Sequence, residues 1–137
     1  MLTPNVAPGS GPFPGRERQW RNAEGASAAE RHAAACLYLA LMTEACLGLI
    51  GAGGPTIVEG PFAANRLYLI QLAALTQRPV IAVEGSTGTS KGASLLAGIR
   101  FTTAAETRIE PARIDGLERY RSLWRALAEG GEDRRHP

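Results

Sequence analysis

Residues 85–90 (Gly-Ser-Thr-Gly-Thr-Ser), followed by Lys91, have the composition of a loop that could hold a phosphate group. Glycines let backbone N–H groups approach phosphate oxygens, and the N-terminus of a following helix attracts negative charge. A Walker A loop, however, requires glycine directly before its lysine and serine or threonine directly after it. This chain has Ser90 and Gly92 at those positions. The segment therefore indicates either a general anion site or an ordinary helix cap.

Residues 60–65 (Gly-Pro-Phe-Ala-Ala-Asn) form a second candidate, at the point where a predicted strand meets a predicted helix. Pro61 suits the first helical position, where its missing N–H costs nothing. The small residues at 63 and 64 allow another group to approach the helix end, and Asn65 presents an amide on its first turn. In open α/β sheets, ligands bind beyond the carboxyl ends of the strands. Plain packing of the turn is the alternative interpretation.

A catalytic constellation is not visible in the sequence. His32 and His136 lie far apart, and Glu44, Glu59 and Glu84 each stand without a second acid at useful spacing. Among these acids, Glu59 is the one that a strand end would place beside a cleft. The spacing of the histidines, cysteines and acids also fits no metal site. We therefore expect no catalytic residue and no metal ligand in this chain.

The two cysteines, Cys36 and Cys46, are ten residues apart in one predicted helix. Their Cα atoms would lie about 15 Å apart, which is too far for a disulfide. We interpret them as buried free thiols, which suit a reducing cytosol. Residues 1–5 have neither the basic nor the apolar part of a signal peptide. These features predict a cytoplasmic protein.

Composition limits the classes of partner. The chain has 137 residues, of which 45% are hydrophobic, and this is enough for one domain with a core. Its 15 basic residues are scattered beside acids and give a net charge of only +2, so we expect no nucleic-acid binding. Charged and polar residues such as Glu44 interrupt the apolar stretch over 33–50, so we expect a helix of a soluble domain and no membrane span.

The elements that would position the candidate residues alternate between helix and strand. Ser27 and Glu30 form a capping box, and a glycine at 51 or 53 ends the helix that follows. Two continuous apolar strands indicate a sheet covered on both faces. The helices are predicted at 28–50, 62–76, 89–99 and 114–128, and the strands at 56–59 and 80–83, with a connection over 100–113. Strand, helix and strand over 56–83 form a parallel βαβ unit.

This pattern divides the chain into three predicted parts. Residues 1–26 are a loop rich in proline and glycine, in which Phe13 and Trp20 are the apolar anchors. Residues 27–128 are the folded domain. Residues 129–137 are a disordered polar tail.

Residues 56–65 (Thr-Ile-Val-Glu-Gly-Pro-Phe-Ala-Ala-Asn), Arg-Pro-Val at 78–80 and Lys-Gly-Ala-Ser-Leu-Leu-Ala-Gly at 91–98 resemble the C-terminal domain of the FGGY carbohydrate kinases. In that family a strand runs into a glycine pair and a short helix with an asparagine. A second strand follows, and then a helix that opens with a Gly-Ala-Ala-like triplet. The match extends over about 28–100. It implies an α/β fold, a partial ribonuclease-H-like lobe of the actin-like ATPase type, with a parallel βαβ unit and flanking helices.

The resemblance also implies a nucleotide site. Gly60 and Pro61 stand where the family's glycine pair meets ATP, and Asn65 stands where its asparagine does. Pro61 departs from the pattern because proline cannot offer the backbone N–H that glycine offers. ATP and Mg²⁺ are the cofactors implied by the family, although the Mg²⁺ ligands have no counterpart in this sequence.

The family's N-terminal lobe, with its catalytic aspartate and first phosphate loop, also has no counterpart here. The resemblance therefore predicts the ATP-binding portion of a sugar or polyol kinase that is inactive without that lobe. The N-terminal lobe would be a separately encoded partner, or the chain would self-associate through an open sheet edge. The alternative is a non-catalytic interaction domain or remnant that has kept the fold and lost nucleotide binding.

Overall fold

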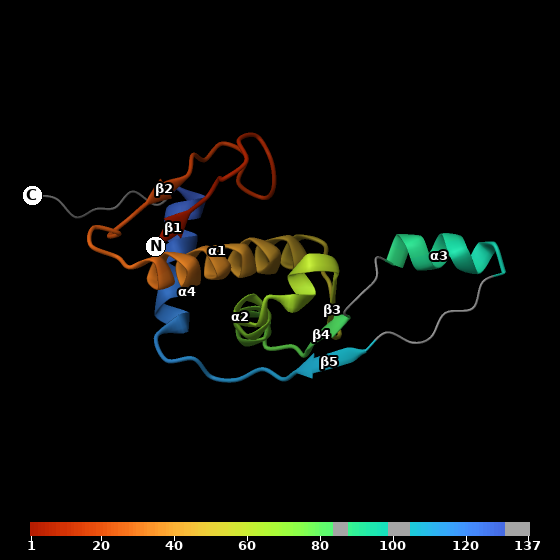
Figure 1. The fold of residues 1–137 in the computed structure, drawn as a ribbon. Helices are drawn as coiled ribbons and strands as arrows, with labels where there is room; N and C mark the ends of the chain where they lie inside the picture. Colours follow the sequence, from red (N-terminus) through yellow and green to blue (C-terminus); the bar gives the residue numbers. More distant parts are fainter. Residues whose placement is uncertain (84–87, 99–104, 131–137) are drawn as a thin grey trace, which may run out of the picture. The chain divides into compact units, whose positions relative to one another are not determined.

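The computed structural model describes residues 1–83, 88–98 and 105–130 (Figure 1). The chain forms two compact units, one made of residues 1–52 and 113–137 and the other of residues 53–112. The first unit contains β1 (Leu2–Thr3), β2 (Gln19–Trp20), α1 (Ala28–Leu49) and α4 (Leu117–Glu129). The second contains β3 (Thr56–Glu59), the 3₁₀ helix η1 (Gly60–Ala64), α2 (Arg66–Thr76), β4 (Val80–Val83), α3 (Gly88–Leu96) and β5 (Glu106–Ile109).

The segment predicted to be a loop rich in proline and glycine, residues 1–26, also contains two short strands. Strands β1 and β2 pair there in antiparallel fashion, with Leu2 opposite Trp20 and Thr3 opposite Gln19. The breakers that suggested a loop lie over 8–15, between the two strands, and they form only the connection. The predicted boundaries at 26/27 and 128/129 stay a prediction, and residues 131–137 of the predicted tail lie outside the described residues.

Helix α1 confirms the predicted caps. The Ser27 hydroxyl accepts a hydrogen bond from the Glu30 backbone N–H, and the Glu30 carboxylate accepts one from the Ser27 backbone N–H. Gly51 follows the last turn with a φ of +62°, a conformation that glycine adopts without strain. Both cysteines are free, but only Cys36 is buried, and Cys46 is exposed. The prediction of two buried thiols is therefore wrong for Cys46, because ten residues turn a helix by about 1000°, which places the two side chains on different faces.

The core of the first unit is built around Trp124 of α4, which is 1% exposed. Its indole Nε1–H donates a hydrogen bond of 2.9 Å to the Leu2 carbonyl oxygen of β1. Phe13 and Tyr38 both contact it edge to face, with ring centroids at 5.6 Å and 6.4 Å. Phe13 is thus an apolar anchor, as predicted, whereas Trp20 is 40% exposed and lies under the Arg31 guanidinium.

The second unit contains a three-stranded sheet in the order β3-β4-β5. Strands β3 and β4 are parallel, with Thr56 opposite Val80 and Glu59 opposite Val83, and α2 lies between them in the chain. The predicted bounds of both strands are confirmed. Strand β5 pairs with β4 in antiparallel fashion and lies in the segment predicted to be a connection. Its sequence, Glu-Thr-Arg-Ile, is largely exposed and lacks the apolar pattern of a buried strand.

Burial differs between the two parallel strands. Central β4 is buried as predicted, and Val80 and Ala82 are 0% and 1% exposed. Strand β3 is not covered on both faces in the described structure, because Ile57 is 64% exposed. The prediction of a buried strand is therefore wrong for β3, which lies at an edge of the described sheet.

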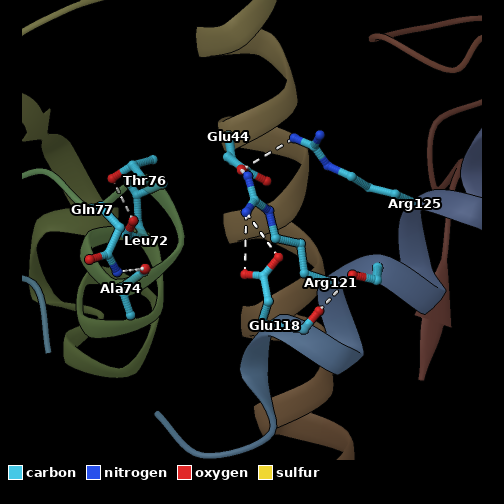
Figure 2. Close-up of polar contacts among 9 residues, drawn as sticks. Glu44, Leu72, Ala74, Thr76, Gln77, Glu118, Arg121 and Arg125 are labelled. Carbon is cyan, nitrogen blue, oxygen red and sulfur yellow. Dashed lines mark hydrogen bonds and ion pairs between the residues drawn. The ribbon is translucent and has the colours of Figure 1, made fainter. Parts of the chain in front are cut away.

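Helix α2 ends where the sequence predicts. Gln77 takes the left-handed conformation, with a φ of +52°, at the C-cap. Its side-chain amide donates a hydrogen bond of 2.6 Å to the Ala74 carbonyl oxygen, and Thr76 donates one of 2.8 Å to Leu72 (Figure 2). The bond from Gln77 satisfies a carbonyl of the last turn that has no partner within the helix, and Pro79 then prevents the helix from continuing.

By length and mean hydropathy (1.4), helix α1 could cross a membrane. Core helices of soluble proteins have the same length and hydropathy, so this property carries little weight. Within α1, Glu44 is buried and bound by two arginines of α4.

Candidate functional site

The turn after β3 is built on the backbone conformation of Gly60. This residue has a φ of +72°, which side-chain-bearing residues rarely adopt. Among the described residues other than its chain neighbours, a Cβ atom added there would meet no atom within 4 Å, so there is space beside the backbone. The helix at this turn is of the 3₁₀ form and begins at Gly60, so Pro61 is its second residue and the predicted first position is wrong by one residue. The predicted helix over 62–76 is therefore divided into η1 and α2.

Asn65 lies at the junction of η1 and α2 and acts as the N-cap of α2. Its side-chain oxygen accepts a hydrogen bond of 3.1 Å from the Tyr68 backbone N–H. Its own backbone N–H donates to the Phe62 carbonyl oxygen at 3.1 Å. Asn65 thus has a structural role that accounts for its position without a ligand. A nucleotide contact of Gly60, Pro61 or Asn65 stays a prediction.

Phe62, in the middle of the turn, is a residue that the sequence analysis missed. Phe62 is 48% exposed, whereas the neighbouring Ala63 is buried. The ring lies 5.5 Å from that of Tyr68, tilted by 59°, and Tyr68 is buried. The sequence feature that could have pointed to Phe62 is its position as the aromatic residue in a turn of small residues.

The parallel pairing of β3 and β4 places their carboxyl ends at one edge of the sheet, where Glu59 is opposite Val83. The turn at Gly60 leaves from that edge. The predicted phosphate loop over 85–90 follows β4 in the sequence, and residues 84–87 lie outside the described residues. Residues 88–90 belong to α3 and are not a loop, because the helix begins at Gly88. Lys91 lies inside this helix, as expected from the sequence.

Glu44 is not the isolated acid that the sequence suggested. Its carboxylate is bound by Arg121 and, at 3.2 Å, by Arg125, both from α4 (Figure 2). Arg121 also contacts Glu118 at 3.3 Å. The Glu44 side chain is 8% exposed and that of Glu118 is 78% exposed. This cluster joins α1 to α4, and its pairing explains why an acid is tolerated in the core.

Tyr120 provides a pH-dependent element in the same helix. Burial raises its pKa from 10 to about 12. Because the folded state holds this proton more tightly than the unfolded state, its contribution to stability is complete below pH 10 and is lost as the pH rises to about 12. We expect the free energy of unfolding to decrease over that range. In Tyr120→Phe the decrease should be smaller, as measured by urea denaturation at several pH values, and an unchanged pH profile would contradict this role.

The capping role of Asn65 gives a second prediction. Asn65→Ala removes the acceptor for the Tyr68 N–H and should lower the free energy of unfolding by about 1 kcal/mol. Asn65→Asp keeps an acceptor at the N-cap and should stay close to the wild type. Urea denaturation of the three proteins measures the difference. Equal losses for alanine and aspartate would show that the cap is not the reason for the effect.

The chain is similar to known proteins in both sequence and structure. The family model described as "Carbohydrate kinase FGGY, C-terminal domain" matches residues 1–107. The chain is also similar to a carbohydrate kinase from Novosphingobium aromaticivorans whose crystal structure is known. The two sequences are 35% identical, and their structures superpose with a TM-score of 0.80. The match covers 96% of this chain and 28% of that chain. A comparison with curated proteins gives no match.

The chain belongs to the FGGY carbohydrate kinase family and corresponds to its C-terminal domain. The predicted α/β fold, with a parallel pair and flanking helices, is thereby confirmed. The chain spans 28% of the length of the related kinase, and its match is to the C-terminal domain.

Proposed function

We propose that this chain is the ATP-binding portion of a carbohydrate kinase that transfers the γ-phosphate of ATP to a sugar or polyol hydroxyl. The observation that carries the proposal is the turn from Gly60 to Asn65. It leaves the carboxyl edge of a parallel strand pair in a domain of a kinase family. Ligands of α/β sheets bind beyond this edge. Family membership supports the use of ATP and Mg²⁺ in general and a cytoplasmic location.

The residues of the turn fit a nucleotide in part. Gly60 has no side chain and the described residues leave space beside it, which would allow a nucleotide to approach the backbone. Pro61 contributes its carbonyl and ring but no N–H. Among the described residues, no three histidine, cysteine or acidic side chains gather into a metal site. Mg²⁺, which would neutralise charge on the phosphates, would then be held by ATP and by the rest of the kinase.

We further propose that the chain is inactive without the N-terminal lobe, which supplies the catalytic aspartate in this family. Phosphoryl transfer depends on positioning and charge neutralisation around the γ-phosphate, and these need both lobes. The lobe would be a separately encoded partner or another part of a longer kinase. Self-association is the other mode of assembly, and the exposure of Ile57 on edge strand β3 supports an uncovered contact surface.

The second candidate function is a non-catalytic interaction domain or remnant that has kept the fold and lost nucleotide binding. Two observations favour it. Pro61 removes a backbone donor from the turn, and the Asn65 side-chain oxygen already caps α2. On this alternative, the turn is a packing feature of β3 and α2.

A phosphorylation assay tests the proposed function. The chain is incubated with ATP, Mg²⁺ and a panel of sugars and polyols, first alone and then with an N-terminal lobe from the related kinase. We expect no turnover by the chain alone and turnover of at least one substrate when the lobe is added. Turnover by the chain alone would contradict the two-lobe requirement. The alternative function predicts no turnover in either case.

A further inference from the structure

We infer that the adenine base of the bound nucleotide stacks on the aromatic ring of Phe62. The inference rests on the proposed function, since it concerns the same turn. It adds a specificity contact that neither the family match nor the sequence resemblance assigns. Phe62 is the aromatic residue within η1, between the positive-φ Gly60 and the N-cap Asn65.

The first observation is exposure. Phe62 is 48% exposed, although it lies directly between Pro61 and the buried Ala63. Contact of an apolar ring with water is unfavourable, so burying the exposed part of the ring against a ligand would contribute favourable binding free energy. Phe62 and Gly60 belong to the same five-residue 3₁₀ turn, so a nucleotide bound at this turn would lie near the ring.

The second observation is that the ring is held in place. The buried ring of Tyr68 lies 5.5 Å from that of Phe62, with an interplanar angle of 59°. The Phe62 carbonyl oxygen also accepts the Asn65 backbone N–H at 3.1 Å, which fixes the backbone of the turn. A ring that is already fixed loses little conformational entropy when a base stacks on it.

Pro61 and Asn65 limit the hydrogen bonds that the turn can offer to a ligand. Pro61 has no N–H, and the Asn65 side-chain oxygen is engaged with Tyr68. Two groups that could read the edge of a base are thus missing or engaged, whereas the Phe62 ring is exposed. Stacking on an aromatic ring is strong and tolerates different bases, because every base has a π-face. We expect this contact to favour a nucleotide over its bare phosphates, with little discrimination between ATP and GTP.

Isothermal titration calorimetry of the full chain tests the inference, with ATP, GTP and inorganic tripolyphosphate as titrants. Phe62→Ala should weaken ATP and GTP binding about tenfold or more, the range for one stacked base. Phe62→Tyr should bind ATP within about twofold of the wild type, because it keeps the ring. Tripolyphosphate has no base, so its affinity should not change in Phe62→Ala.

Leu96→Ala is the matched control, because Leu96 is also an exposed apolar residue of the second unit, at 92% exposure. It should leave all affinities unchanged, and circular dichroism should show that each variant is folded. If the wild type binds ATP and Phe62→Ala binds it equally well, the inference is overturned and the proposed function stands. An equal loss for ATP and tripolyphosphate would also overturn it. If the wild type binds no ATP at millimolar concentration, the proposed function fails as well.

Discussion

Trp124→Ala should lower the free energy of unfolding of the first unit by about 3–5 kcal/mol, which is typical of replacing a fully buried tryptophan by alanine. Trp124 is 1% exposed and is among the largest fully buried side chains. Its removal leaves a cavity between Phe13 and Tyr38 and takes away the donor to the Leu2 carbonyl oxygen. A loss of this size is a large part of the stability of a small domain. Urea denaturation, followed by circular dichroism, measures it.

Two variants separate the causes of this effect. Trp124→Phe keeps an aromatic ring and loses the hydrogen bond to Leu2, so it should be less damaging than alanine. Leu123→Ala, at the adjacent position in α4, removes a side chain that is 42% exposed and should cost about 1 kcal/mol or less. Equal stabilities of Trp124→Ala and Leu123→Ala would contradict the central position of Trp124 in the core.

Glu44→Ala has the second largest expected effect, a loss of about 2–3 kcal/mol in the free energy of unfolding. Removing one partner of a buried ion pair leaves the other charge without compensation, and this costs up to about 5 kcal/mol for fully buried pairs. The side chains of Arg121 and Arg125 are 26% and 41% exposed, so water replaces part of the lost interaction. The expected loss is smaller for this reason. Urea denaturation measures it.

Glu118→Ala provides a matched control for Glu44→Ala. It removes the same functional group from the same Arg121, but the Glu118 side chain is 78% exposed. Exposed ion pairs are worth at most about 1 kcal/mol. We expect Glu118→Ala to be several times less destabilising than Glu44→Ala. A larger loss for Glu118→Ala than for Glu44→Ala would show that burial does not determine how much these ion pairs stabilise the fold.

The helices and strands that could be predicted from the sequence are those whose ends carry strong local signals. The capping box at Ser27 and Glu30 marks the start of α1, and Pro55, Gly60 and Pro79 bound the two parallel strands. Strand β5 could not be found in this way, because a charged and exposed edge strand carries no apolar pattern and is defined by its pairing with β4. The pairing of β1 with β2 depends likewise on residues that are distant in the sequence.

The candidate site shows the same division. The position of the turn at Gly60 follows from local backbone preferences, and the structure confirms it, with Pro61 in the first turn of the 3₁₀ helix. The accessibility of Phe62 and the pairing of Glu44 depend on tertiary packing, which sequence spacing does not reveal. The assignment of the turn to a nucleotide came from family resemblance, and the family itself is confirmed.

The most direct test of the proposal that this chain is the ATP-binding portion of a kinase is calorimetric titration of the wild-type chain with ATP and ADP. The account predicts saturable binding of both nucleotides. Saturation is expected without the N-terminal lobe, because the candidate turn lies wholly within this chain. Absence of binding at millimolar nucleotide, in a protein that circular dichroism shows to be folded, would contradict it and favour the interaction domain.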